Sequence, residues 1–275
     1  MQVVYLEIRA MSSSLYTICV IKAVLFDLDE TLILDEAVSF QAFRIAALSV
    51  TTEVDAANLA HAAEKHARRL WQSLPMPALE YTSRIGHSAL EGLWASYDRN
   101  LEPEALLQDH IDEYRFQTWA AALTECGLKA DARVLEKLWQ SLRARYPLYS
   151  DADDLLVRLK KNYKLGIVTN GVAGLQRKKW HGCGLETWFD AVAISGELGI
   201  GKPNPQIFEW VATELQVPLE SCLMVGDNAD RDVQGGINAG IKTVWVDRGF
   251  KPKTATATLS VKELLEILPW LEMQT

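Results

Sequence analysis

Short apolar runs alternate with longer amphipathic stretches over the second half of the chain, and one more such run lies near its beginning. Apolar runs of about four to eight residues bounded by turn-forming residues are typical of buried strands. They occupy residues 21–27, 164–170, 191–195, 221–227 and 242–247. Continuously apolar strands separated by helix-length stretches are typical of a parallel sheet. The pattern therefore predicts an α/β domain, with a Rossmann-like parallel sheet covered by helices on both faces.

The segment after the first run has a different pattern. Over residues 37–146, apolar positions recur at helical spacing and no strand-like alternation is present. We therefore predict an all-helical insert, packed as a bundle, between the first strand and the rest of the sheet. Trp71, Trp94, Trp119 and Trp139 are expected in its core, because aromatic residues at helical spacing usually pack inside. The alternative is that one of them lines a substrate pocket.

The domain boundaries follow from this change of pattern. We expect an N-terminal extension over residues 1–20, an α/β core over residues 21–35 and 147–275, and a helical cap domain over residues 36–146.

The last amphipathic stretch, residues 260–271, is predicted to be a helix. Ser260 is its expected N-cap, and Glu263, three residues later, would complete a capping box. No stretch reaches the ~18 consecutive apolar residues of a membrane span. The longest candidate, residues 15–26, is interrupted by Lys22. The first residues also lack the basic and apolar regions of a signal peptide.

The composition indicates a soluble globular protein with a substantial core, since 49% of the 275 residues are hydrophobic and 23% are charged. The formal net charge of −8 disfavours a nucleic-acid polymer or an anionic membrane as partner. A local basic pocket for a small phosphorylated ligand stays compatible with that charge. The sequence does not indicate an oligomeric state.

The four cysteines give no metal pattern. No two of them have C-x-x-C spacing, and His181 with Cys183 is the nearest approach to a ligand pair. Scattered reduced thiols are typical of cytosolic proteins. We therefore predict a cytoplasmic location. The cysteines are Cys19, Cys126, Cys183 and Cys222.

Polar residues gather at four predicted strand ends. Asp27 and Asp29 follow the first strand, and Thr169-Asn170-Gly171 follows the second. Each group alone could be a turn or a helix cap. However, open α/β sheets bind ligands beyond the carboxyl ends of their strands, so we expect these residues to converge at one edge. Lys202, after the third strand, and Asp227 and Asp232, after the fourth, complete the set.

The residue types in this set fit phosphoryl transfer. Carboxylates from two strand ends make the oxygen site that Mg²⁺ prefers, and the cation lets Asp27 and Asp227 stay ionised side by side. Asp27 is the candidate nucleophile, which would form an aspartyl-phosphate. Asp29 is placed to protonate the leaving alcohol and then to activate water. The candidate phosphate-binding residues are Thr31, Thr169, Asn170, Gly171 and Lys202.

The segment DLDETL resembles the first motif, D-x-D-x-T, of the haloacid dehalogenase superfamily. Thr169, Lys202 and the pair Asp227 and Asp232 match its next three motifs in order. The resemblance implies a central first strand and a helical cap inserted just after the first motif. It also implies Mg²⁺ held by the Asp27 and Asp227 carboxylates and the Asp29 backbone carbonyl, with Asp232 orienting Lys202 or a water molecule on the metal. The chain looks most like the branch with pyrimidine 5′-nucleotidases and N-acylneuraminate-9-phosphatase.

We therefore predict an Mg²⁺-dependent phosphomonoester hydrolase for a nucleoside 5′-monophosphate or sugar phosphate. A metal-independent dehalogenase is disfavoured, because those enzymes lack the second acid that Asp29 supplies. A phosphoglucomutase-type phosphotransferase shares all four motifs and stays an alternative. A receiver-like phospho-acceptor module is disfavoured by the position of Asp27 on the first strand. A Rossmann dehydrogenase is disfavoured because GELGIG lacks the required glycine spacing.

The cap would select the leaving group, but the sequence does not single out which of its residues do so. Arginines of the cap could contact substrate, although such residues usually lie on a solvated face. The three basic residues 177–179 are likewise expected on the exposed side of a helix. The cap arginines concerned are Arg84, Arg115, Arg143 and Arg145.

Overall fold

The computed structural model describes residues 20–274, so nearly all of the predicted N-terminal extension, with Cys19, lies outside the described residues. A six-stranded, wholly parallel sheet forms the core, in the order β3-β2-β1-β4-β5-β6. The predicted α/β fold class and the central first strand are confirmed. The strands are β1 (Ala23–Phe26), β2 (Lys164–Thr169), β3 (Ala191–Ile194), β4 (Cys222–Gly226), β5 (Lys242–Val246) and β6 (Leu259–Val261).

Both faces of the sheet are covered, which explains why its strands are apolar throughout. Val24 and Phe26 of β1 pack into one hydrophobic cluster with α7 (Ala152–Leu159) and α12 (Ile267–Glu272). Ala23 and Leu25 point to the other face and pack with α10 (Gln206–Glu214). Because alternate residues of a strand face opposite sides, a strand covered on both sides needs apolar residues at every position.

The register of the strands brings three carboxyl ends together. Ala23 of β1 pairs with Lys164 of β2 on one side and with Cys222 of β4 on the other. The residues that follow these strands therefore emerge at the same edge. Short elements complete this part of the chain: α8 (Ala173–Gly182), α9 (Ser195–Leu198), η1 (Leu219–Ser221), the π-helical turn η2 (Ala229–Val233) and α11 (Gln234–Asn238).

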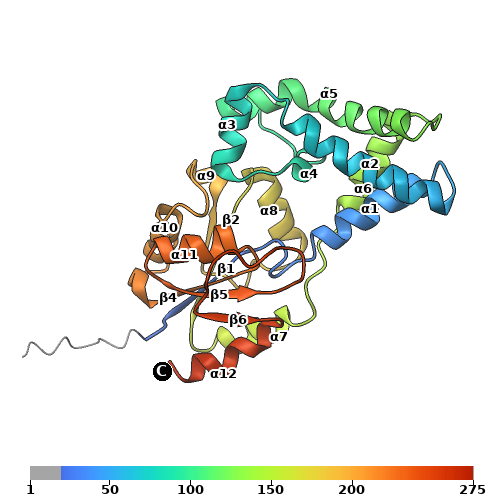
Figure 1. Ribbon diagram of the computed structural model, residues 1–275. Helices are drawn as coiled ribbons and strands as arrows, with labels where there is room; N and C mark the ends of the chain where they lie inside the picture. Colours follow the sequence, from blue (N-terminus) through green and yellow to red (C-terminus); the bar gives the residue numbers. More distant parts are fainter. Residues whose placement is uncertain (1–19, 275) are drawn as a thin grey trace, which may run out of the picture.

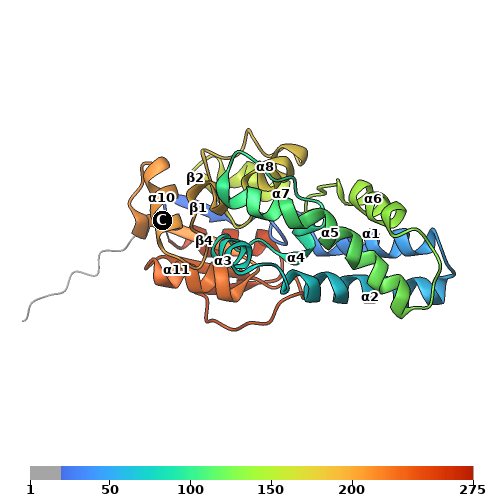
Figure 2. The same ribbon diagram turned by 90° about the horizontal axis from the view of Figure 1, so that it is seen from above.

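Six helices form the insert between β1 and α7. They stand above the core in Figure 1, and Figure 2 shows the longer ones running side by side away from it while α3 lies over the sheet. The four tryptophans are buried in the insert's own hydrophobic cluster, as predicted. The helices are α1 (Glu36–Leu48), α2 (Glu53–Trp71), α3 (Met76–Ile85), α4 (Ala89–Gly92), α5 (Glu102–Glu125) and α6 (Ala132–Arg143).

The predicted helix over residues 260–271 is wrong in its first half. Ser260 lies in β6 and pairs with Trp245, while the helical part comprises the short turn η3 (Leu264–Glu266) and α12. The exposed edge of β5 offers unpaired backbone groups to the chain at Leu259–Val261, and that pairing overrides a local N-cap preference. None of the helices in the described chain is long and apolar enough to cross a membrane.

Candidate active site

Three carboxylates and one ammonium group meet at the carboxyl edge of the sheet. The side chains of Asp27, Asp227 and Asp232 each offer an oxygen within 4.8 Å of the others. Lys202 Nζ lies 2.6 Å from Asp27 Oδ1 and 2.7 Å from Asp232 Oδ1. All four residues are buried. The edge borders a cavity of about 200 Å³ below the helical insert. The structure thus brings together predicted residues from three strand ends.

Asn170 fixes the backbone of Lys202. Its side chain accepts a hydrogen bond from the Lys202 N–H at 2.8 Å and donates one to the Lys202 carbonyl at 2.9 Å. Burial alone would lower the pKa of Lys202, but the carboxylates of Asp232 and Asp27 raise it above its ordinary value. The lysine is therefore held in place and stays charged at the edge of the cavity.

Asp227 is the least satisfied carboxylate of the group. Burial raises its pKa to about 7, although Lys251, with Nζ 2.7 Å from Asp227 Oδ2, acts in the opposite direction. Neither carboxylate oxygen accepts a hydrogen bond of ordinary geometry from the described residues. Buried carboxylates that lack donors are costly unless a cation or proton neutralises them. A site of three clustered aspartates, in which Asp227 faces the partly exposed Lys251, fits a hard divalent cation such as Mg²⁺.

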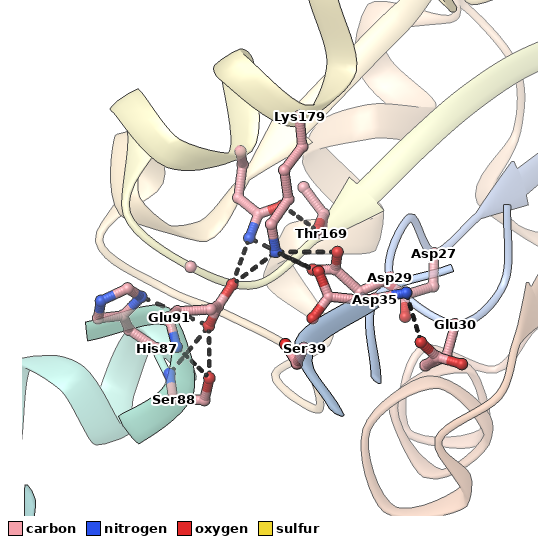
Figure 3. Close-up of polar contacts among 12 residues, drawn as sticks. Asp27, Asp29, Glu30, Asp35, Ser39, His87, Ser88, Glu91, Thr169 and Lys179 are labelled. Atoms are coloured by element: carbon pink, nitrogen blue, oxygen red, sulfur yellow. Dashed lines mark hydrogen bonds and ion pairs between the residues drawn. The ribbon is translucent and has the colours of Figure 1, made fainter. Parts of the chain in front are cut away.

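Asp29 belongs to a second group of charges. It turns toward Lys179 of α8, whose Nζ lies 2.9 Å from both carboxylate oxygens of Asp29 (Figure 3). The same ammonium lies 3.0 Å from Glu91 Oε1 and 3.4 Å from Asp35 Oδ1. Arg143 forms a further ion pair with Asp35.

Counting charges in this second group indicates which acid carries a proton. Two cations, Lys179 and Arg143, face three carboxyl groups, so one carboxylate lacks a counter-charge. Burial, together with repulsion from Asp35 and Glu91, raises the pKa of Asp29 to about 8 despite the attraction of Lys179. Burial acts in the same direction on Asp35 and Glu91, but their cationic partners lower both pKa values. Asp29 is therefore the group best placed to hold a proton near neutral pH.

Two of the predicted phosphate-binding residues face elsewhere. Thr31 is fully buried, and its hydroxyl accepts a hydrogen bond from the Asp227 N–H at 3.1 Å. The Gly171 N–H donates to Ser195 Oγ at 2.8 Å. Neither residue lines the cavity, so both hold strand ends in place. Thr169 does line it, as do Asn170 and Lys202.

The predicted exposure of Lys179 and Arg143 is wrong, because both side chains are fully buried. Their spacing from buried apolar residues on the same helix could have indicated this burial. Lys179 comes four residues after Leu175 on the buried face of α8, and Arg143 comes four residues after Trp139 on that of α6. Arg84, Arg145 and Lys178 are exposed as predicted, and Arg177 is partly exposed and pairs with Glu197. Arg115 is half-buried and donates to backbone carbonyls of the insert.

A larger cavity of about 800 Å³ adjoins the first one, between α2, α3 and the turn into α4. Gly86, Ser88 and Arg231 line both cavities. Trp71 lines the larger one, so one predicted core tryptophan also faces a cavity. Among the described residues, Arg231 has no carboxylate partner, and its Nη1 donates to the Gly86 carbonyl at 3.2 Å. Sequence reasoning did not single out Arg231, Lys251 or Glu91.

Comparison with known proteins assigns this chain to a family. The model of haloacid dehalogenase-like hydrolases matches residues 21–240. A phosphoserine phosphatase of Thermus thermophilus is 38% identical over 90% of this chain and 97% of its own length. The N-acylneuraminate-9-phosphatase of Rattus norvegicus is 37% identical over 53% of this chain and 62% of its own length. The pyrimidine 5′-nucleotidase YjjG of Escherichia coli is 32% identical over 64% of this chain and 76% of its own length.

A solved structure of the same family agrees with the fold. The HAD-hydrolase YfnB of Bacillus subtilis, bound to magnesium, matches with a TM-score of 0.58 and 25% identity, over 92% of this chain and 99% of that one. The predicted resemblance is confirmed: this chain belongs to the haloacid dehalogenase-like hydrolases and is an enzyme of their phosphatase type.

Proposed function

We propose that the protein is an Mg²⁺-dependent phosphomonoester hydrolase that works through an aspartyl-phosphate on Asp27. The observation that carries this proposal is the separation of two aspartates that are two residues apart in sequence. Asp27 lies with Lys202, Asp227 and Asp232, whereas Asp29 lies with Lys179. One carboxylate is thus available as nucleophile while the other is placed to handle a proton.

Each residue then has a definite task. Asp27 attacks phosphorus, and Lys202, held by Asn170 and charged, neutralises phosphate oxygens as the ester bond breaks. Asp29 gives its proton to the departing alcohol oxygen and afterwards takes one from the attacking water. Mg²⁺, held by Asp27, Asp227 and the Asp29 backbone carbonyl, would supply positive charge for the phosphate oxygens. Thr169 borders the cavity where the phosphate would lie.

The larger cavity supports a small metabolite as substrate. It adjoins the carboxylate site through Gly86, Ser88 and Arg231, so the alcohol part of a substrate would lie there. The named relatives act on phosphoserine, N-acylneuraminate 9-phosphate and pyrimidine 5′-nucleotides, which share only a phosphate ester on a small polar alcohol. We infer a substrate of that size, no nucleic-acid or membrane partner, and a cytoplasmic location.

The test is the substitution Asp27→Asn, assayed with p-nitrophenyl phosphate and a panel of phosphorylated metabolites. We expect the loss of at least about 10³-fold in turnover, because the amide is a poor nucleophile. Asp230→Asn, an exposed aspartate in the turn η2 that follows β4, is the matched control. Full activity in Asp27→Asn would overturn the nucleophile assignment.

Metal removal tests the proposed dependence on Mg²⁺. EDTA should abolish turnover and added Mg²⁺ should restore it; turnover that persists in EDTA contradicts the metal assignment. A phosphotransferase, the alternative that shares all four motifs, would transfer the phosphoryl group to a second sugar. Stoichiometric release of inorganic phosphate without any acceptor excludes that alternative.

A further inference from the structure

Lys179 is a fully buried lysine that contacts three carboxylates from three parts of the chain. Asp29 follows β1, Asp35 precedes α1, and Glu91 belongs to α4 of the insert. Figure 3 shows all three converging on the Lys179 ammonium group. A buried lysine is costly unless its partners surround it, so its position is set closely by those partners.

Gln176, one turn earlier on α8, supports the same arrangement. Its Nε2 donates to Glu91 Oε1 at 2.7 Å and lies 3.4 Å from Asp29 Oδ2. Its Oε1 accepts a hydrogen bond from Thr169 Oγ1 at 3.2 Å. The buried face of α8 therefore holds Asp29 through an ammonium and an amide.

Glu91 is itself fixed. Its second oxygen, Oε2, accepts the Ser88 N–H at 2.9 Å, and the Glu91 N–H donates to Ser88 Oγ at 3.3 Å, which completes a capping box. The Ser88 hydroxyl also lies 3.0 Å from Oε2. His87 Nδ1 lies 3.5 Å from the same oxygen. Glu91 is thus anchored on the insert and fixes Lys179 from the side opposite Asp29.

We propose that Lys179 is a positioning residue that holds the Asp29 carboxyl group toward the leaving-group oxygen, and that Glu91 of the insert holds Lys179 in turn. This inference rests on the proposed function. In the step concerned, a bond forms between an Asp27 carboxylate oxygen and phosphorus, the ester P–O bond breaks, and the Asp29 proton passes to the departing oxygen. Lys179 keeps its own protons throughout.

The proposal predicts a dependence on the leaving group. An alkoxide needs the Asp29 proton to depart, whereas p-nitrophenolate is stable without one. The ratio kcat/KM covers events up to the first irreversible step, so it reports departure of the alcohol and excludes later hydrolysis of the aspartyl-phosphate. A disturbed Asp29 should therefore lower kcat/KM for alkyl phosphates selectively.

The experiment compares kcat/KM for the best alkyl phosphate of the substrate panel with that for p-nitrophenyl phosphate. In Lys179→Met we expect a fall of about 10²-fold for the alkyl ester and about threefold or less for p-nitrophenyl phosphate. Lys179→Arg keeps the charge and should recover part of the loss. Lys178→Met, the exposed neighbour on the same helix, is the matched control and should leave both values unchanged.

Glu91→Gln keeps the shape of the side chain and tests the link to the insert if Lys179→Met does not fold. We expect the same selective fall, but smaller, with a thermal unfolding midpoint close to that of the wild type. Equal losses for both esters, in whichever of these variants folds, would overturn the positioning role and leave the proposed function intact. An inactive wild type would overturn both, and the two failures are thereby distinguishable.

Discussion

Lys202, Lys179 and Lys251 each place an ammonium group beside buried carboxylates, but their partners give them different tasks. Lys202 joins Asp27 to Asp232, and Lys251 faces Asp227, where a metal ion would compete with it. Lys179 faces Asp29 instead. Burial strengthens these interactions, because charges attract and repel more strongly away from water. The two aspartates of one short motif therefore lie beside different lysines.

Arg231 is a further basic residue whose surroundings suggest a role in binding substrate. It lines both cavities and, within the described chain, has no acidic partner. A half-buried arginine without a carboxylate is suited to an anionic group of a ligand. We predict that Arg231→Gln raises KM about tenfold for substrates with a carboxylate on the alcohol, such as phosphoserine, and changes KM for p-nitrophenyl phosphate little.

The measurement is KM over the same substrate panel, with Arg84→Gln, an exposed arginine of α3, as the matched control. An equal change in KM for carboxylate-bearing and uncharged alcohols would show that Arg231 does not distinguish between them.

At the scale of elements, the end of α3 is where the insert comes nearest to the strand ends. Gly86, the C-cap of α3, has a left-handed backbone with φ of 69°. A Cβ atom built there would lie 2.4 Å from Asn170 Nδ2, the side chain that fixes Lys202. Ser195 Oγ also donates to the Ile85 carbonyl at 2.6 Å. Glycine is needed here both for backbone conformation and for close approach.

We predict that Gly86→Ala lowers kcat/KM at least about tenfold, because displacement of Asn170 moves Lys202. The left-handed conformation should also cost about 1 kcal/mol of unfolding free energy. Gly127→Ala is the matched control: Gly127 has φ of 65° just after α5, and apart from its chain neighbours no described residue has an atom within 4 Å of its built Cβ. Chemical denaturation and steady-state kinetics of both variants provide the comparison. Comparable activity losses in the two would contradict the role of close approach.

On the scale of the whole molecule, the insert and the core have largely separate hydrophobic clusters. Near the cavities they meet through polar contacts such as Lys179 with Glu91 and Arg231 with Gly86. Acids that are buried or partly buried at this junction make the stability of the fold depend on pH and on metal. Burial raises the pKa of Asp227 to about 7 and that of Asp29 to about 8, both from 3.8. Such groups stabilise the fold when protonated. Their contribution is complete below the ordinary pKa of 3.8, declines as pH rises above it, and is lost once pH has passed about 7 for Asp227 and about 8 for Asp29.

We therefore predict that, in EDTA, the thermal unfolding midpoint falls by about 5 °C between pH 6 and pH 8. Mg²⁺ replaces the proton at Asp227, so adding it at pH 8 should recover most of the loss. Asp35 and Glu91 act in the opposite direction, because their pKa values are lowered and they stabilise the fold when ionised. Their contribution to stability is lost only on acidification, below the range from pH 6 to pH 8. Calorimetry of the wild type and Asp227→Asn measures the effect. A wild-type response to pH and Mg²⁺ no larger than that of the variant would contradict it.

The sequence by itself determined the sheet and the strand-end residues, because both are encoded locally. An apolar run that ends in Asp27, or in Gly226 before Asp227, places its polar residue at the edge of a parallel sheet wherever the other strands lie. The same local reasoning failed at Ser260, where strand pairing decided the structure.

Only the tertiary structure decided how Asp29 is held and which residues border the larger cavity. Lys179 and Glu91 are separated by 88 residues in sequence, and Lys179 and Asp29 by 150. No local pattern connects residues so distant, since their contacts depend on how the insert packs over the core. The residue types at the strand ends are thus encoded in short motifs, whereas the contacts of Lys179 with Asp29 and Glu91 arise from packing between distant segments of the chain.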